Sequence, residues 1–459
     1  MTKDLEKERL GSLILKLSVP AILSMIAAAV YNLVDRIFVG QIDPLALTAV
    51  GVTMPLQIAQ MAFVLMIGVG SSTLMSIYMG KKEAEKANRI LLTATLYIVI
   101  SLVGLTGIGV LFLDRIFELL KVSKEVHPLA KDYIVILLLG GAPGLSGYCL
   151  TNCIRSLGHA KEAMVYITVS SLLNIVLDYL FVLKLGYGVK GAAVATVISQ
   201  VLVTVFVARF FLKHPLGEEG FSHLKGKELW HNISEITQNG LPTLYMQVFG
   251  TVVAIVLNRY IIFYGGDYHL ASITIITSIS HFFLMVVYGV GQGTQAIFGY
   301  NYGAGKMDRT KAALKISLGF VIAFTVTVLV AIQAVPRFFI GLFTDEAELM
   351  DITVHNIRIY LSMLPMVGIH SIATTYLTSI KQPKMSTILY ILRYGAILIP
   401  ALLVLPKFMG SDGVYFSNAI SEGLSGLIAL VMLGYFLKKS PEELYRGEGR
   451  TDEKRSVER

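Results

Sequence analysis

Two acidic residues and an amide stand inside apolar stretches of this sequence. Asn174 and Asp178 interrupt the run 172–181, and Asp35 interrupts an earlier run. On a helix, a spacing of four residues places Asn174 and Asp178 on the same face. An aspartate inside a membrane helix is unfavourable by about 2.5–3.5 kcal/mol on insertion scales, so it needs a partner, a proton or a bound cation. These residues therefore indicate a site for a cation or a proton.

Oxygen-bearing side chains of three predicted helices lie at a similar depth in the membrane. Asp35 lies about 6 Å of helix rise from the outer end of its run, and Asp178 and Thr196 lie about 9 Å from the outer ends of theirs. We therefore predict a cation-binding site formed by Asp35, Asn174, Asp178 and Thr196, with the two aspartates as metal ligands if the ion is sodium. If the carboxylates come close, repulsion and loss of water favour a proton on one of them, so sodium and protons both remain open.

Each of these residues also has a purely structural interpretation. Asp35 could face lipid headgroups beside Arg36, and Asp178 could make a structural hydrogen bond. Thr196 could bond to a carbonyl of its own helix. The cation site is thus a prediction that the arrangement of the helices must support.

The composition is that of a membrane protein. Of 459 residues, 54% are hydrophobic and 15% are charged, whereas a soluble domain carries roughly 25% charged residues. The net charge of +8 comes mostly from loops and tails, so it indicates membrane orientation and not nucleic-acid binding. Cys149 and Cys153 stand one helical turn apart in an apolar segment and are interpreted as packing thiols, with no disulfide framework or zinc spacing.

Twelve apolar runs are long enough to cross a bilayer. They lie near 13–38, 46–78, 90–113, 130–155, 163–184, 190–212, 237–264, 270–300, 313–338, 354–380, 385–405 and 413–437. We therefore predict an all-α integral membrane protein, with a first six-helix lobe at 1–212, a cytoplasmic linker at 213–235, a second six-helix lobe at 236–437 and a cytoplasmic tail at 438–459. The tail is polar and charged and is expected to be disordered.

An internal repeat relates the two halves. One constant shift along the chain superposes Pro20 on Pro242, Pro143 on Pro365, Gly188 on Gly410, Gly191 on Gly413, Ile198 on Ile420 and Ser199 on Ser421. Each half has an even number of spans, so the halves share one topology and form two bundles related by an axis along the membrane normal, as in parallel-repeat transporters. At the same shift, Asp35, Asn174 and Asp178 fall on apolar residues or proline, which assigns the charged site to the first lobe alone.

Lysine and arginine predict the orientation. With both termini in the cytoplasm, roughly 27 basic residues lie inside, including Arg155 in the loop after the fourth span. The expected location is the inner (plasma) membrane.

Other polar residues in the spans are candidates for a substrate cavity. In the first lobe these are Tyr31, Asn152 and Gln200; in the second they are Gln247 and Gln292, with Asn258, His281, Gln295 and His370 as weaker candidates. Arg259 and Arg393 are expected to extend to the membrane interfaces.

The chain resembles the multidrug and toxic compound extrusion (MATE) family over residues 10–437. The supporting strings are 18–20 (SVP), 31–35 (YNLVD), 174–178 (NIVLD), 191–196 (GAAVAT), 291–295 (GQGTQ) and 299–305 (GYNYGAG). The resemblance implies a secondary transporter that exports amphipathic, often cationic drugs in exchange for sodium or protons, with the cation site at Asp35, Asn174, Asp178 and Thr196. Some members carry an acid in the seventh span, where this chain has Gln247 nearby and no acid, so ion coupling through the second lobe is in doubt.

Two other functions agree less well with the sequence. A lipid or lipid-linked oligosaccharide flippase would need several arginines or lysines for a diphosphate, and the spans hold chiefly Arg259 and Arg393. An enzyme has little support, because no HExxH, P-loop or nucleophile-elbow motif is present. We expect a monomeric transporter in the lipid bilayer with small-molecule substrates, no nucleic-acid partner and no cofactor beyond a coupling ion, Na⁺ or H⁺.

Overall fold

The computed structural model describes residues 3–218, 220, 224 and 226–439, and within these ranges the chain is all-helical, with no strand. The first half contains α1 (Lys3–Lys7), α2 (Leu10–Gly40), α3 (Pro44–Gly80), α4 (Ala84–Leu111), α5 (Leu113–Leu119), α6 (Val126–Ser156), α7 (Ala160–Asp178), the π-helical segment η1 (Tyr179–Lys184) and α8 (Gly188–Lys213). The second half contains α9 (Gly226–Gly303), α10 (Met307–Ala334), α11 (Pro336–Ile340), α12 (Ala347–Tyr360), α13 (Leu364–Ser379), α14 (Pro383–Tyr390), the π-helical segment η3 (Ile391–Leu398), α15 (Ile399–Val404), α16 (Pro406–Met409) and α17 (Ser411–Lys438). The predicted all-α class is confirmed.

The predicted count of twelve spans is obtained when a bend between two helices and a break within another are taken into account. Ten helices of the described chain are long and apolar enough to cross a membrane, and α12 with α13 makes one more span that is bent by 46°. The long element α9 is two helices that meet at Gly266, whose φ of 70° and ψ of −162° lie outside the helical region, a conformation that suits glycine. Counting α9 as two spans gives twelve. Its start at Gly226 makes the last part of the predicted linker helical, and the tail from residue 440 lies outside the described residues.

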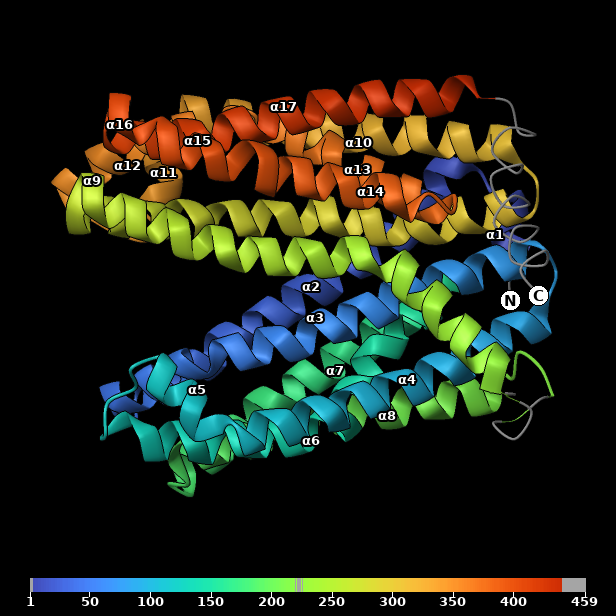
Figure 1. The fold of residues 1–459 in the computed structure, drawn as a ribbon, viewed down its shortest axis with the longest axis horizontal. Helices are drawn as coiled ribbons and strands as arrows, with labels where there is room; N and C mark the ends of the chain where they lie inside the picture. The colour runs from blue at the N-terminus through green and yellow to red at the C-terminus, as the bar shows by residue number, and fades with distance from the viewer. Residues whose placement is uncertain (1–2, 219, 221–223, 225, 440–459) are drawn as a thin grey trace.

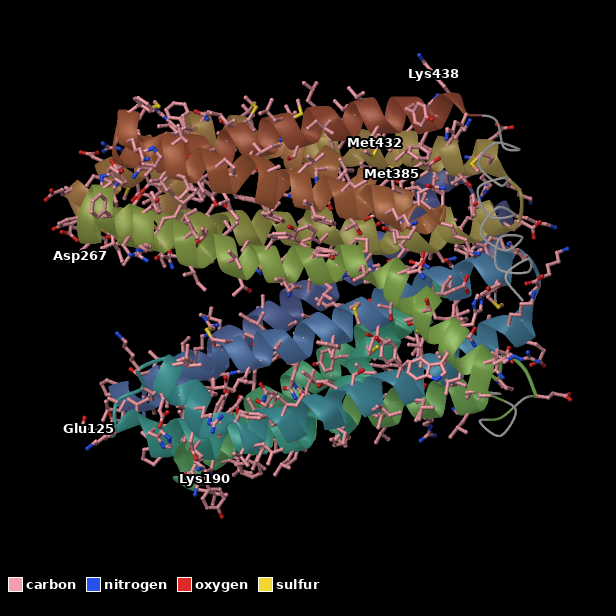
Figure 2. The ribbon with its side chains drawn as sticks, in the orientation of Figure 1. Glu125, Lys190, Asp267, Met385, Met432 and Lys438 are labelled. Carbon is pink, nitrogen blue, oxygen red and sulfur yellow. The ribbon has the colours of Figure 1, made fainter. Side chains whose placement is uncertain are left out.

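The two halves of the chain form two lobes that diverge toward one end of the molecule (Figure 1). Helices α2–α8 make one lobe, and α10–α17 with most of α9 make the other. The lobes approach each other at the end that carries α1 and the last turns of α17, here called the α1 end. Figure 2 shows Lys438 at this end, whereas Glu125, Lys190 and Asp267 lie at the opposite end. The first helix of the described chain thus begins, and the last one ends, on the same side of the molecule, as an even number of spans requires.

Equivalent turns at the α1 end show the internal repeat in the backbone. The turn after α3 has hydrogen bonds from the Lys82 amide to the Met79 carbonyl and from the Glu83 amide to the Tyr78 carbonyl, and the turn before α10 has the same two bonds within 301–306. Lys82 and Gly305, which occupy the same place in these two turns, both have positive φ. Helices α4 and α10, which follow these two turns, are both 28 residues long. One hairpin geometry is therefore built twice.

Helices α2 and α9 both pass from one lobe to the other. The first half of α2, with Leu13 and Leu17, packs into the second lobe's core, while Asp35 further along lies among first-lobe helices. Conversely, Ile236 of α9 packs into the first lobe's core. Pro20 and Pro242 lie inside the two helices, where a proline removes a backbone hydrogen bond and permits a kink. The crossing helices connect the interiors of both lobes.

Glycines close the interface at the α1 end. A Cβ on Gly303 would lie 2.1 Å from the Ile77 carbonyl oxygen, and a Cβ on Gly80 would lie 2.1 Å from the Tyr300 carbonyl oxygen. Nearer the middle of the molecule, a Cβ on Gly240 would lie 2.0 Å from a carbonyl oxygen of α3. Backbones this close leave no room for a side chain. Gly80 and Gly303 each immediately precede one of the two equivalent turns, so repeat-related positions pack against each other.

Candidate functional site

The four predicted cation ligands come from three helices of the first lobe. Asp35 lies in α2, Asn174 and Asp178 lie in the last turns of α7, and Thr196 lies in α8. The carboxylates of Asp35 and Asp178 are close enough to repel each other. Asp178 is the last residue of α7 before the π-helical turns of η1, and such turns often mark functional positions. The structure brings these side chains together, and their role as cation ligands stays a prediction.

Five polar atoms of this group are buried without a hydrogen-bond partner. They are Oδ1 of Asp35, both side-chain polar atoms of Asn174 and both carboxylate oxygens of Asp178. Asp178 is 0% exposed and Asp35 is 8% exposed, so neither is a lipid-headgroup contact. Buried polar groups in a native protein are almost always paired, and orphans call for an ion, a proton or water. Four of the five atoms are oxygens, the donors preferred by small hard cations.

A tyrosine that the sequence did not single out completes this cluster. Tyr133 of α6 is 3% exposed, and its hydroxyl is within electrostatic range of both Asp35 and Asp178. It lies about 10 Å of helix rise from the start of α6 at the outer end, a depth close to that of Asp178. Matched depth was thus a signal that could have found it.

A small cavity lies beside the carboxylates, deeper in the first lobe. Its lining includes four of the predicted residues, Tyr31, Asn174, Thr196 and Gln200. The remaining lining residues are Tyr148, Ser170, Ser171 and Ser199. The hydroxyl of Ser170 donates to the Ser199 carbonyl at 2.6 Å and so ties α7 to α8. Tyr31 and Gln200 therefore lie next to the predicted cation site, within one polar chamber.

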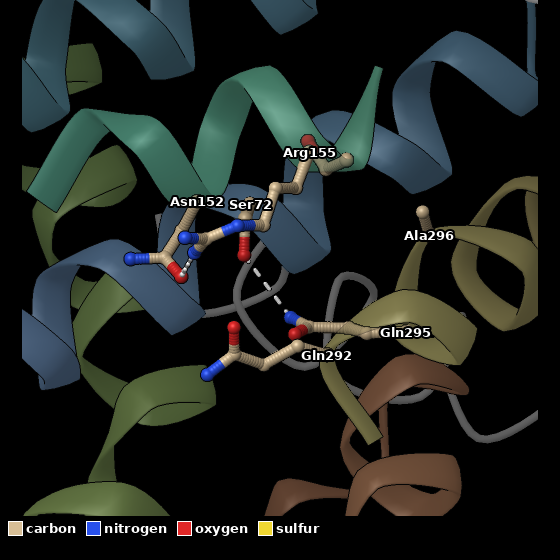
Figure 3. Close-up of a pocket in the computed structure, with 7 residues that line it drawn as sticks. Ser72, Asn152, Arg155, Gln292, Gln295 and Ala296 are labelled. Carbon is tan, nitrogen blue, oxygen red and sulfur yellow. Dashed lines mark hydrogen bonds between the residues drawn. The ribbon is translucent and has the colours of Figure 1, made fainter. Parts of the chain in front are cut away.

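A second cavity lies between the lobes, and two further predicted substrate residues, Asn152 and Gln292, line it. Asn152 of α6 faces Gln292 of α9 across this space, with Ser72, Arg155, Ser156, Gln295 and Ala296 also lining it (Figure 3). Gln295 donates to Thr73 Oγ1 at 2.7 Å and to Ser72 Oγ at 3.0 Å. This amide fixes one wall of the inter-lobe cavity by bonding the second lobe to α3.

Arg155 is a correction to the sequence analysis. It was placed in a cytoplasmic loop, but it lies in the last turn of α6 and is 8% exposed, with its guanidinium in the inter-lobe cavity. Helix α6 ends at Ser156, close to the end of the predicted run, and the facing lobe buries its last turn. A basic residue at the inner end of a span is not necessarily in water.

The other second-lobe candidates do not gather around either cavity. Gln247 is half-buried in α9 and lines neither cavity among the described residues. Asn258 and His281 are exposed on α9, facing away from the core. Their positions in apolar spans did not determine which face they occupy.

Arg393 is also a correction, because it does not extend to an interface. It is 5% exposed and forms a salt bridge of 2.5 Å with Glu422 of α17. His370 is fully buried beside it, with its Nδ1 3.5 Å from Arg393 Nη1. Glu422 falls on Gln200 in the repeat, so the second lobe carries an acid at a position equivalent to the first lobe's chamber. The acids of the first lobe do not reveal it, because Glu422 has a glutamine and not an acid as its counterpart.

Comparison with known proteins places this architecture in a family. The MatE family model matches residues 20–180 and 240–404, once in each half of the chain. The chain belongs to the MatE family. Its members are transporters and not enzymes, and they include multidrug exporters.

Relatives and solved structures align over nearly the whole chain. The multidrug export protein MepA of Staphylococcus aureus (strain MSSA476) is 26% identical over 437 residues, covering 94% of this chain and 95% of MepA. MepA of Staphylococcus saprophyticus is 24% identical over the same span. Among solved structures, a multidrug resistance MATE transporter in an outward-facing conformation has a TM-score of 0.89 at 23% identity, covering 96% and 98% of the two chains. The D35N mutant of the Vibrio cholerae MATE transporter VcmN also reaches 0.89, at 19% identity, covering 95% and 98%. This MatE chain therefore has the fold of those transporters, which have twelve helices in two repeats.

Proposed function

We propose that this protein is a cation-coupled antiporter that exports amphipathic, often cationic drugs by alternating access, with sodium or protons as the coupling ion. The observation that carries the proposal is the group of buried, unpartnered oxygens on Asp35, Asn174 and Asp178. Two carboxylates that repel each other in a buried site favour capture of a positive charge. The multidrug export function of the MepA relatives supports drugs as the cargo.

Helix α2 connects the proposed ion site to the interface between the lobes. Asp35 lies in its outer part, while Ser18 and Ile22 lie in its inner part against Gly293 and Gly289 of α9. Neutralising Asp35 removes the repulsion with Asp178 and allows α2 to bend around Pro20. A bend there moves Ser18 and Ile22 relative to α9. Ion binding is thereby linked to the contact that holds the lobes together at the α1 end.

The position of the closed end supports export as the direction of transport. The lobes meet at the α1 end and diverge at the other (Figure 1). With the termini in the cytoplasm, this conformation is closed to the cytoplasm. Cation entry from outside would then act on the state that releases the drug, as an exporter requires.

A liposome assay tests the function. Purified protein is reconstituted, and uptake of a fluorescent cationic dye is followed while a sodium gradient or a pH gradient is imposed in turn. We expect one gradient to drive dye movement in the wild type and not in Asp35→Asn or Asp178→Asn. Asn32→Gln on an exposed face of α2 serves as the matched control. Undiminished gradient-driven transport in both aspartate variants would refute the ion site, and no dye movement under either gradient would refute drug antiport.

The flippase alternative loses its two candidate phosphate ligands. Arg259 is exposed on α9, and Arg393 is neutralised by Glu422. A diphosphate group needs several free cationic donors in one cavity, and the described residues that line the two cavities above include one arginine, Arg155, and no lysine, so no observation favours this function.

A further inference from the structure

Arg155 is a buried cation at the interface of the two lobes, and no carboxylate of the described residues forms an ion pair with it. Its Nη1 donates to Asn152 Oδ1 at 3.2 Å, which is a neutral amide. Its Nε is buried and has no partner. With 8% of its surface exposed, the guanidinium has lost most of its hydration. A buried charge of this kind is stable only when an opposite charge accompanies it.

The opposite wall of the inter-lobe cavity also has an unpaired polar group. Gln292 of α9 has a buried Oε1 without a partner, and its Nε2 reaches only Met25 Sδ at 4.0 Å. Gln295 beside it is already bonded to Ser72 and Thr73, so Gln292 is the amide that can turn toward a ligand. Figure 3 shows Arg155 and Asn152 above this space and Gln292 below it. The unpartnered atom of Gln292 is an acceptor, so Gln292 donates to an anion only when its amide turns over and directs Nε2 into the cavity. Arg155 and Gln292 then supply donors to one small volume from both lobes.

We infer that this cavity binds the carboxylate of a zwitterionic substrate, with Arg155 as its counter-charge and Gln292 as a second donor from the other lobe. A planar guanidinium matches the geometry of a carboxylate and can form two hydrogen bonds with it. The inference rests on the proposed export function and narrows its substrate class. Drugs that carry both a cation and a carboxylate are expected to bind in preference to purely cationic ones with the same skeleton.

The cavity is separate from the first-lobe chamber that contains the proposed ion site. The inter-lobe cavity is lined by α3, α6 and α9, whereas the chamber is lined by α2, α6, α7 and α8. A negative group of the substrate at Arg155 is therefore kept apart from the negative charges of Asp35 and Asp178. In this conformation the cavity has room for about one water molecule, so a substrate carboxylate reaches Arg155 when the lobes part at the α1 end.

A matched pair of dyes tests the inference. One is a rhodamine with a free carboxylate, and the other is the methyl ester of the same dye, which is a simple cation. Binding to the purified full-length protein is measured by fluorescence anisotropy for the wild type, Arg155→Gln and Arg155→Lys. We expect Arg155→Gln to weaken binding of the free acid by about tenfold or more, the effect of losing one charge-assisted hydrogen bond, and to leave the ester within about twofold. Arg155→Lys, which keeps the charge without the planar fork, is expected to fall between.

Control variants keep the result interpretable. Arg209→Gln removes an exposed arginine of α8 and should change neither dye. If Arg155→Gln does not fold, Gln292→Leu tests the same site from the other lobe and should weaken the acid alone. Equal changes for acid and ester, or no change for either, would overturn the inference. Absence of ester transport by the wild type under both ion gradients would instead count against the proposed export function.

A dissolved anion is the competing source of the same charge. The thermal stability of the wild type is compared in chloride and in gluconate without dye. A chloride-dependent stabilisation that disappears in Arg155→Gln, with no preference for the free acid, would assign the site to the dissolved ion and overturn the substrate carboxylate. Equal stability in both salts together with selective loss of the acid supports the inference.

Discussion

Replacing Gly303 by alanine should open the interface at the α1 end. The new Cβ would lie 2.1 Å from the Ile77 carbonyl oxygen and 3.0 Å from the Ile77 Cα. Real Cβ atoms essentially never approach closer than 3.0 Å, so α3 and α9 must separate by about 0.9 Å (3.0 minus 2.1). The obstructing atoms belong to a helix backbone and cannot rotate away. Overpacking of this kind destabilises by about 1–3 kcal/mol.

This cost falls only on the conformation in which the lobes meet. A conformation that separates them at the α1 end places no atom against the new methyl group. A difference of about 1–3 kcal/mol between two states corresponds to a shift of about 5–150-fold in their ratio. The population of the separated state should therefore rise by that factor.

Distances between two spin labels, measured by double electron–electron resonance, report this shift in the population of the separated state. Labels on Lys86→Cys and Asp308→Cys lie at exposed positions near the starts of α4 and α10, the two repeat-related helices. The native Cys149 and Cys153 are fully buried and should not react. We expect Gly303→Ala to broaden the distance distribution and extend it to longer distances.

A second glycine provides the control. Gly319 of α10 has nothing within 4 Å of an added Cβ, so Gly319→Ala should leave the distances unchanged and slightly favour the helix. An unaltered distribution in Gly303→Ala, or the same change in both variants, would refute the reasoning that backbone contact at this glycine holds the lobes together.

Three further outcomes are expected. Arg393→Met should lower the free energy of unfolding by about 3–5 kcal/mol, because it leaves Glu422 charged and buried without a partner. Replacing both Arg393 and Glu422 by Met should recover most of this loss. Thermal unfolding in detergent measures both variants, and equal losses in the two would contradict a buried ion pair. The hydrogen bond from Lys306 lowers the pKa of Glu6, so the contact of α1 with the second lobe should be present above pH about 4.5 and be lost as pH falls through the lowered pKa; amide exchange in α1 that is independent of acid pH would contradict this. Tyr133→Phe should weaken the coupling ion's affinity without changing dye binding, because it removes only the hydroxyl, which is within electrostatic range of both carboxylates. Titration of transport against ion concentration measures this affinity, and an unchanged affinity would remove Tyr133 from the site.

The ion site could be predicted from the sequence because each of its acids is conspicuous within its own apolar stretch. An acid in an apolar run is rare enough to need an explanation, and its depth follows from helix rise. The four-residue spacing of Asn174 and Asp178 decided that they share a face. Tyr133 gave no such signal, since tyrosine is common in membrane helices, and only its depth matched.

Residues whose surroundings come from segments distant in sequence were misplaced. The end of the apolar run predicts that Arg155 lies in a loop, and the cost of placing arginine in lipid predicts that Arg393 lies at an interface. Each is buried by helices that the local sequence does not reveal. Glu422 was missed because a comparison from the first lobe's acids does not search for acids that only the second lobe has.

The sequence by itself determined the helices, their number, the repeat and the depth of each polar group, because these depend on hydrophobic periodicity and helix rise along one chain. The tertiary structure decided which polar groups meet. It brought Asp35 to Asp178 from helices far apart in the sequence, paired Arg393 with Glu422, and placed Arg155 opposite Gln292 between the lobes. The physical reason is that burial and electrostatic pairing depend on how separate helices pack, and glycine contacts such as those of Gly80 and Gly303 set that packing only when both backbones are in place.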